Sequence, residues 1–478
     1  MPTLETIEQL AKRRGFFYPS GEIYGGFAGF YEYGHLGTLM KRKIENIWRK
    51  FFLKQENFFE IDPSNIMTER VFEASGHLKS FVDPIVKCKK CGTVHRADHI
   101  MEEFLKERFE GLTPEQLTEI IKKHNVRCSK CKGELQEVGV LNMMFPLEIG
   151  AERDLKGYLR PETAQGVYIN FLRQFELLRK KLPIGLAIIG RAYRNEISPR
   201  QLITRMREFS QAELQIFFNP DNLDKHEKFD EIKNYKLIIC PIKGKIKEVK
   251  CSDMKLPKFY VYHMAKVQQF FLNILKIPKD KFRLKELSEE EKAFYNKLHW
   301  DIEFNLDSLG WKEIGGIHYR TDHDLSGHEK VSKQSQKIFY DNKKFIPHVL
   351  ELSFGIDRIL YGMLDLFYTK RKDKVILKLP FSIAPITVGV FPLVNKDGLD
   401  KKAKEVYEKL KDWFDVFYDD SGSIGRMYAR ADEIGIPLCI TIDYDTKKDN
   451  TVTIRDRDTT KQERIKIDKL VDTICKRF

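Results

Sequence analysis

Charged side chains flank apolar runs in a predicted hairpin near the middle of this chain. Within residues 190–213, Arg194 and Glu196 follow one apolar run, and Glu213 precedes another. Alternate residues of a strand share a face, so Arg194 and Glu196 are expected on one face of a hairpin whose long loop spans residues 199–205. For an isolated hairpin, a solvated sheet face with cross-strand ion pairs explains the same row.

A later strand and helix favour a functional site over a solvated face. Glu351 and Ser353 share one strand face, and Gly355 permits a tight turn. Arg358 then lies in the first turn of a helix predicted over residues 356–367. A helix N-terminus favours anions, and a guanidinium binds phosphate through two N–H groups. This end of the chain therefore predicts phosphate binding.

The elements around these residues suggest a multidomain chain. A helix is predicted over residues 4–14, and apolar residues at helical spacing predict a long amphipathic helix over 36–54. Residues 220–300 are polar and lysine-rich without clear periodicity, so we expect an insertion there. A charged linker at 371–380 precedes alternating strands and helices over 381–478, which predict a compact α/β domain.

Length and composition fit a cytoplasmic globular protein. The 478 residues suggest about three domains at ~150 residues each. Hydrophobic residues make up 42% and charged residues 32%, which argues against global disorder. The net charge of +13 favours a polyanionic partner, although a basic balance alone is weak evidence. No signal peptide or membrane-spanning segment is expected.

Two cysteine pairs, Cys88–Cys91 and Cys128–Cys131, have the spacing of zinc knuckles. Each pair presents two thiolates to a tetrahedral ion, and the stretch between the pairs must fold back through a helical insert. The alternatives are free thiols or a degenerate site that has lost its metal. The other four cysteines are scattered, which suits a reducing compartment. The nearby histidines are expected to be exposed helix residues and not ligands: His95, His99 and His124.

Several strings together resemble motifs 1, 2 and 3 of the class II aminoacyl-tRNA synthetases, and specifically the homodimeric glycyl-tRNA synthetase family. One departure is Leu352, where the family usually has proline; its side chain is expected to point away from the functional face. The strings that carry the resemblance span nearly the whole chain: residues 75–77, 160–166, 194–200, 207–209, 351–355, 422–426 and 432–435.

The resemblance implies an α+β fold. A class II catalytic domain with an antiparallel sheet flanked by helices would span residues 1–370, with a zinc-knuckle insertion at 86–140. An anticodon-binding domain would follow the linker and take up residues 381–478. The region from the glycine-rich stretch through Pro63 would form a homodimer interface, although the apolar face of the 36–54 helix could equally be intrachain core. The implied partners are glycine, ATP and the tRNA that accepts glycine.

The resemblance also assigns site residues. Glycine offers only an ammonium and a carboxylate, so its pocket should be acidic and leave no room for a side chain. The implied glycine-binding residues are Arg96 (for the carboxylate), Glu162, Phe209, Gln211, Glu213, Glu351 and Ser353. The implied ATP-binding residues are Arg194, Asn195, Glu196, Thr204, Arg207, Phe209, Glu313, Ile314, Gly355, Ile356, Asp357 and Arg358, with Arg194 and Arg358 catalytic and Glu313 a Mg²⁺ ligand.

Two alternatives stay open at this point. A synthetase-like protein could bind RNA without catalysis, but such proteins usually lose the motif 2 or motif 3 arginine, and Arg194 and Arg358 are both present. The same fold could charge histidine, proline or threonine, which the 160–166 string argues against. In the C-terminal domain, basic and aromatic residues could meet RNA or could pair with nearby aspartates: Arg426, Tyr428, Arg430, Arg455 and Arg457.

Overall fold

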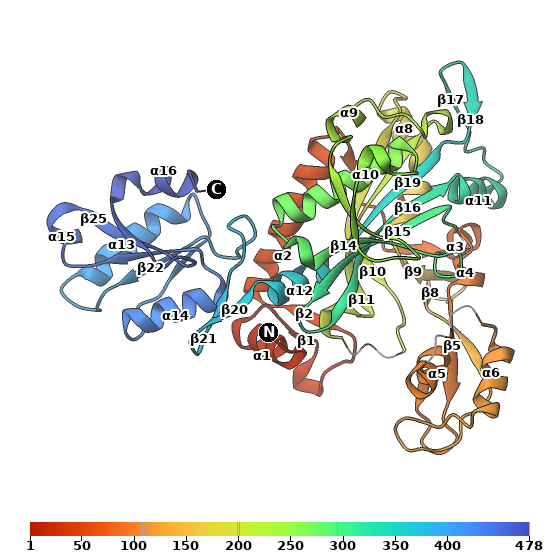
Figure 1. Ribbon diagram of the computed structural model, residues 1–478, viewed down its shortest axis with the longest axis horizontal. Coiled ribbons are helices and arrows are strands. Elements are labelled where there is room, and N and C mark those ends of the chain that lie inside the picture. The colour runs from red at the N-terminus through yellow and green to blue at the C-terminus, as the bar shows by residue number, and fades with distance from the viewer. Residues whose placement is uncertain (107–108, 110–111, 198, 200, 294, 478) are drawn as a thin grey trace.

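The computed structural model describes residues 1–106, 109, 112–197, 199, 201–293 and 295–477. It has three parts (Figure 1): a central body built on a large sheet, a small lobe that projects from it, and a separate C-terminal domain. In the described part of the chain, no helix has the length and apolar character needed to cross a bilayer.

A nine-stranded sheet forms the centre of the body, and its neighbouring strands run antiparallel except for the pairs β12–β14 and β10–β3. This confirms the predicted antiparallel sheet flanked by helices. In order across the sheet, the strands are β13 (Lys247–Lys250), β12 (Lys236–Cys240), β14 (Phe282–Glu286), β15 (Leu298–Leu306), β16 (Gly310–Thr321), β19 (His348–Gly355), β11 (Glu208–Phe218), β10 (Ile184–Tyr193) and β3 (Phe59–Glu60).

The amphipathic helix predicted over residues 36–54 is observed as α2 (His35–Trp48), which continues as a π-helical turn, Arg49–Lys54. Its apolar face packs inside the chain: Met40, Ile44 and Trp48 are fully buried, and the Trp48 ring meets Phe354 of β19 edge-on. The sequence left two roles open for this face, a dimer interface or the core of the chain itself, and the structure supports the second. The helix predicted at the N-terminus is α1 (Leu4–Arg14).

Residues 220–300 are not the polar insertion that their composition predicts. Strands β12, β13 and β14 from this segment extend the central sheet at one edge. Helix α10 (Lys258–Gln269) is buried on nearly all sides, with Tyr260, Met264 and Val267 in the main core. Because α10 is buried around most of its circumference and polar side chains such as His263 and Gln268 are among the buried ones, it lacks the one-sided periodicity that identifies a surface helix.

The projecting lobe spans the zinc-knuckle insertion and has its own small hydrophobic core. Its packing brings the two cysteine pairs together, with Cys88 and Cys128 inside that core. Its elements are β5 (Val82–Lys87), β6 (Val94–Arg96), α5 (Ala97–Leu105), α6 (Pro114–Lys123) and β7 (Gly139–Asn142).

The C-terminal domain is the predicted compact α/β unit, with a five-stranded sheet in the order β23-β22-β24-β25-β26. The expected charged linker at 371–380 is instead mostly a hairpin, β20 (Tyr368–Arg371) and β21 (Lys374–Leu377), with Leu377 and Leu379 buried. The domain's elements are β22 (Val388–Pro392), α13 (Leu399–Lys411), β23 (Val416–Tyr418), α14 (Ile424–Ile434), β24 (Leu438–Ile442), β25 (Thr451–Asp456), β26 (Gln462–Lys466) and α16 (Leu470–Cys475).

The basic residues of this domain divide into two kinds. Arg455 forms a two-pronged pair with Asp432, and Arg457 is buried against Asp458 and backbone carbonyls, so aspartate pairing describes both. Arg430 also pairs with an aspartate, Asp419. Arg426 is exposed on α14 and remains a candidate for RNA contact.

Candidate active site

A cavity of about 890 Å³ opens on the central sheet, between the sheet and the lobe. Its size suits a nucleotide with a small second substrate. The three sequence stretches expected to cooperate meet here. Of the predicted site residues, the cavity is lined by Arg96, Glu162, Arg194, Glu196, Thr204, Phe209, Gln211, Glu213, Glu313, Ile314, Glu351, Ser353, Gly355, Asp357 and Arg358.

Three buried carboxylates form one end of the cavity. Glu213 of β11 and Glu351 of β19 come from neighbouring strands, and Glu162 follows β9 (Leu155–Leu159). The hydroxyl of Ser353 donates to Glu213 at 2.9 Å, and Thr163 donates to the same carboxylate from its backbone N and its hydroxyl. Burial, together with Glu351 and Glu162, raises the pKa of Glu213 to about 7.

One arginine that sequence reasoning did not single out holds this acidic end together. Arg320 of β16 is fully buried and donates to Glu351 at 3.0 Å, to Glu162 at 3.4 Å and to Asp324 at 2.8 Å. Burial opposes ionisation of Glu162, but Arg320 and His77 hold its pKa well below its usual value. A buried charge needs such partners, so the arginine and the acids depend on one another.

Arginines dominate the other end of the cavity. Strand β10 stops at Tyr193, so Arg194 and Glu196 belong to the loop after the strand and not to the strand face predicted for them. The Arg194 guanidinium lies between two rings, with its carbon 5.4 Å from the centre of Phe81 and 5.3 Å from that of Phe209.

Arg358 lies on α12 (Ile356–Leu366) and pairs with the Glu313 carboxylate at 2.9 Å. It also donates to the Thr204 carbonyl, so it fixes the loop between β10 and β11 against β16. The Glu313 side chain is 52% exposed, which leaves its oxygens accessible from the cavity.

Three predicted ATP-binding residues do not line the cavity. Asn195 donates from its backbone N to the Met143 carbonyl, and Ile356 is buried in the core. Arg207 donates to the carbonyls of Glu196 and Ala28, so its guanidinium ties the loop to the glycine-rich N-terminal stretch. Membership of a short motif therefore does not tell whether a side chain faces the cavity or supports the residues that do.

Two further predicted residues line the cavity but are already engaged. Asp357 accepts from the hydroxyl of Tyr33 in β2 (Tyr31–Tyr33) and from the backbone N of Ser210. Arg96 of the lobe is paired with Asp98 and, at 3.2 Å, with Asp83. Its guanidinium therefore faces the cavity while held by two acids.

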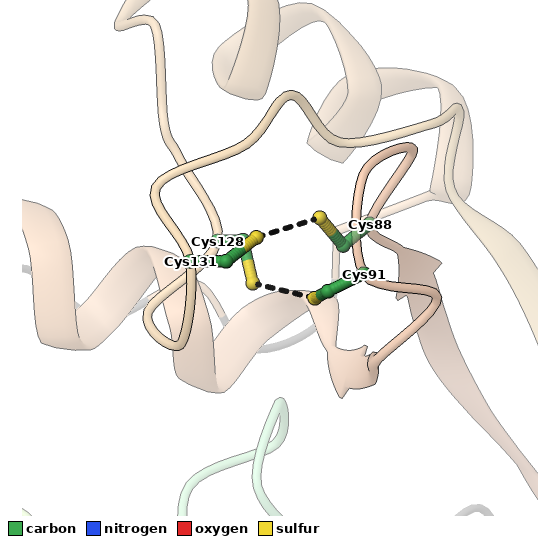
Figure 2. Close-up of side chains that lie close together, drawn as sticks. All are labelled: Cys88, Cys91, Cys128 and Cys131. Atoms are coloured by element: carbon green, nitrogen blue, oxygen red, sulfur yellow. Dashed lines mark hydrogen bonds between the residues drawn. The ribbon is translucent and has the colours of Figure 1, made fainter.

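The four cysteines of the lobe converge as their spacing predicts (Figure 2). All four Sγ atoms lie within 4.8 Å of one another; those of Cys88 and Cys131 are 3.5 Å apart, and those of Cys91 and Cys128 are 3.7 Å apart. Four sulfurs around zinc at about 2.3 Å would lie about 3.8 Å from one another, so the cluster fits a tetrahedral ion.

His95 differs from the sequence-based expectation. It lies on β6 and not on a helix, and its Nε2 is 3.3 Å from the Cys128 sulfur. This contact is typical of a side chain that supports a thiolate from behind the metal site.

Comparisons with known proteins agree with this geometry. A family model for the tRNA synthetase class II core domain (G, H, P, S and T) matches residues 147–367, and one for an anticodon binding domain matches residues 387–477. The glycine–tRNA ligase of Thermococcus sibiricus is 41% identical over 98% of both chains, and that of Methanocaldococcus jannaschii is 40% identical over 99% of both.

The chain belongs to the glycine–tRNA ligase family. The alignment with the T. sibiricus enzyme runs over 559 positions, more than the 478 residues of this chain, so parts of that enzyme have no counterpart here. Among solved structures, a prolyl-tRNA synthetase from Cryptosporidium parvum complexed with L-proline and AMP has a TM-score of 0.62 at 15% identity. The match covers 99% of this chain and 75% of that one, and it shows that the class II fold is shared.

Proposed function

We propose that this chain joins glycine to its tRNA in two steps within the cavity described above. The observation that carries the proposal is the convergence of Glu162, Glu213 and Glu351 at one end of a single cavity and of Arg194 and Arg358 at the other. This arrangement suits a small ammonium-bearing substrate beside a polyphosphate.

The acidic end would bind the ammonium group of glycine. Glu213 and Glu351 carry the attracting charge, and the buried Gln211 Oε1 has no hydrogen-bond partner among the described residues, so it is free to accept an N–H of the substrate. Arg96 would meet the glycine carboxylate, and its pairing with Asp83 would have to loosen for it to do so. A larger amino acid is rejected by a clash, because its side chain would meet packed polar groups.

The arginine end would bind ATP. Arg194 would contact the α-phosphate and Arg358 the γ-phosphate, while Phe209 would stack on adenine. A carboxylate oxygen of glycine attacks the α-phosphorus, and the bond to the bridging oxygen breaks, releasing pyrophosphate. A terminal ribose hydroxyl of tRNA then attacks the glycyl carbonyl, and AMP leaves.

No nucleophile from the enzyme is needed for either step, because orientation and charge neutralisation supply the rate. Glu313 would hold Mg²⁺, and its exposed carboxylate fits a hard cation that also takes phosphate oxygens. Mg²⁺ supplies further charge neutralisation on the phosphates when bound.

The Cys88, Cys91, Cys128 and Cys131 cluster would hold a structural zinc ion that stabilises the lobe. The thiols require a reducing compartment, so we propose the cytoplasm as the site of action. The C-terminal domain would bind the anticodon region of tRNA.

A homodimer would form through the N-terminal region that ends at Pro63. Tyr24 and Phe27 in the glycine-rich stretch at the start of this region are 89% and 61% exposed, which supports an interface there.

Pyrophosphate exchange without tRNA, measured with each of the twenty amino acids, tests the proposal. We expect glycine alone to drive exchange, and Arg194→Ala to abolish it while the protein stays folded. Exchange with another amino acid would change the substrate, and no exchange with any would favour an RNA-binding protein without catalysis.

A further inference from the structure

Two histidines outside the family motifs continue the acidic end of the cavity from Glu351 across three neighbouring strands. His299 on β15, His318 on β16 and Glu351 on β19 are cross-strand partners, and each lines the cavity. Directly opposed residues of this kind present their side chains on the same face of a sheet. The row therefore connects the proposed ammonium site to the wall of the cavity.

Each contact along this row is close. The Nε2 atoms of His299 and His318 are 3.0 Å apart, and the two rings are nearly perpendicular at 84°. Nδ1 of His318 contacts Oε1 of Glu351, and Nε2 of His299 lies 3.1 Å from Asp301. The chain of contacts thus runs from Asp301 through both histidines to Glu351.

The hydrogen positions follow from the partner at one end. The Asn296 amide nitrogen lies 3.3 Å from Nδ1 of His299, and an amide nitrogen only donates, so Nδ1 accepts and the proton of His299 is assigned to Nε2. That proton has two acceptors within reach, Oδ1 of Asp301 at 3.1 Å and Nε2 of His318 at 3.0 Å, so Nε2 of His318 carries no proton of its own. Burial lowers the pKa of His318 well below its usual value, so its ring carries one proton, assigned to Nδ1 and donated to Glu351.

The two oxygens of Glu351 have different partners. Oε2 accepts from Gln215 at 2.7 Å and from Arg320 at 3.0 Å, whereas the hydrogen bond at Oε1 comes from His318. The backbone makes room for this contact at Gly316, because a Cβ there would lie 2.2 Å from Nε2 of His318. The rotation of the Glu351 carboxylate about its last bond is therefore fixed at both oxygens only when His318 is present.

We propose that His318 is a positioning residue for amino-acid binding, which holds the ionised Glu351 carboxylate in the orientation that receives the substrate ammonium, with His299 and Asp301 fixing the tautomer of His318. The inference rests on the ammonium-binding role proposed for Glu351. The charged and titratable groups that face this row are Glu162, Glu213, Glu313, Arg320 and Asp324.

Glycine-dependent pyrophosphate exchange on the full chain tests this role. His318→Ala should raise the KM for glycine about 10- to 100-fold, the range expected for losing one hydrogen bond to a charged group, and leave the KM for ATP unchanged. His318→Asn, whose amide can donate near the position of Nδ1, should restore much of the affinity. His124→Ala, on an exposed residue of the lobe, is the control.

The pH dependence separates positioning from mere packing. A donor to Oε1 favours the ionised form of Glu351. Burial raises the pKa of Glu351, so losing this donor in His318→Ala should raise that pKa further. In a Glu213→Gln background, which removes the titration assigned to Glu213, His318→Ala should therefore move the rise in glycine KM at acid pH to a higher pH, and His318→Asn should move it back. Packing alone predicts no such movement.

Two outcomes would overturn the inference: a folded His318→Ala with the wild-type KM for glycine, or equal losses for glycine and ATP. The Glu351→Gln variant tells whether the role of His318 alone is wrong or whether the ammonium-binding role of Glu351 is wrong as well. Wild-type glycine binding in Glu351→Gln removes the proposed role of Glu351. A defect in Glu351→Gln together with normal binding in His318→Ala rejects only the role of His318.

Discussion

Arg320 donates a hydrogen bond of 3.0 Å to Glu351, and solvent reaches neither side chain to any useful extent. The same guanidinium serves Glu162 and Asp324, so three acids depend on one cation. Removing one partner of a buried ion pair leaves uncompensated charge. Arg320→Met should therefore lower the free energy of unfolding by about 3–5 kcal/mol, measured by urea denaturation at neutral pH.

Arg320→Lys is the matched control for this prediction. It keeps the charge but has a single ammonium in place of the planar fork, so an intermediate loss is expected. A stability of Arg320→Met equal to that of the wild type would show that the acids are neutral in the folded protein.

The pH dependence of glycine binding should reflect Glu213, whose pKa burial and the neighbouring acids raise to about 7. A protonated carboxyl cannot pair with an ammonium, so the KM for glycine should rise as the pH falls below about 7. Steady-state exchange kinetics between about pH 6 and 8 measure this. Glu213→Gln should have weak binding at every pH and a flatter profile; an unchanged profile would assign the titration to another group.

The same raised pKa has an opposite consequence for stability. The folded protein holds the proton of Glu213 more tightly than the unfolded chain does, for which 4.5 is the ordinary value. The contribution of this group to the free energy of unfolding therefore falls as the pH rises from about 4.5 to 7 and stays at its lowest above that. Comparing urea midpoints of the wild type and Glu213→Gln across this range isolates the contribution.

Gly315 is expected to be intolerant of any side chain. A Cβ at this position would lie 2.1 Å from the Ser353 carbonyl, which is backbone of the neighbouring strand and cannot rotate away. Gly315→Ala should lower the unfolding free energy by more than about 2 kcal/mol and impair both substrates, because β16 and β19 carry residues of both ends of the cavity. Gly425→Ala has open space around the new atom and should be close to neutral.

Metal removal should act on the lobe alone. With zinc bound at the four cysteines, Cys128→Ser should lower the zinc content and expose the lobe to proteolysis while the central sheet stays folded, because the lobe has its own core. Mass spectrometry and limited proteolysis measure the two effects. Cys475→Ser, at an exposed position, is the control. A metal-free wild type with an ordered lobe would contradict the zinc assignment.

Binding of tRNA should depend steeply on salt, because phosphate contacts release counterions. Affinity should fall about tenfold or more between about 50 and 200 mM salt in a filter-binding or anisotropy assay. Arg426→Ala, which removes an exposed cation of α14, should reduce the slope by about one. A flat salt profile for the wild type would argue against a tRNA partner.

The sequence predicted the elements that have apolar residues on one face only. It also predicted the site residues that lie within the family motif strings. Helix α1, the α12 strand–helix junction and the alternation of the C-terminal domain follow this rule. The prediction failed for α10, which is buried on nearly all sides. It also failed for the β20–β21 hairpin, in which exposed charged residues stand beside buried apolar residues. Composition averages over the two faces of a strand, so lysines on one side mask leucines on the other.

The acids and arginines of the candidate site that lie in motif strings could be predicted from the sequence. The residues that hydrogen-bond to them and hold them in place could not. Arg320, His318 and His299 belong to strands whose neighbours across the sheet cannot be known without the register. Conversely, Arg207 and Asn195 lie inside a motif, yet the fold turns them toward backbone partners. A motif identifies which segments meet; only the strand pairing says which side chain faces the cavity.

Asp357 accepts hydrogen bonds from Tyr33 of β2 and from Ser210 of β11, and so links the N-terminal segment to a strand of the candidate site. A shift of the hairpin formed by β1 (Phe17–Pro19) and β2 would pull on the strand that carries Phe209, Gln211 and Glu213. The β1–β2 hairpin is thus part of the structure that supports the candidate site. A partner bound at the exposed side chains of Tyr24 and Phe27, which lie between β1 and β2, would contact the same hairpin that Asp357 links to β11.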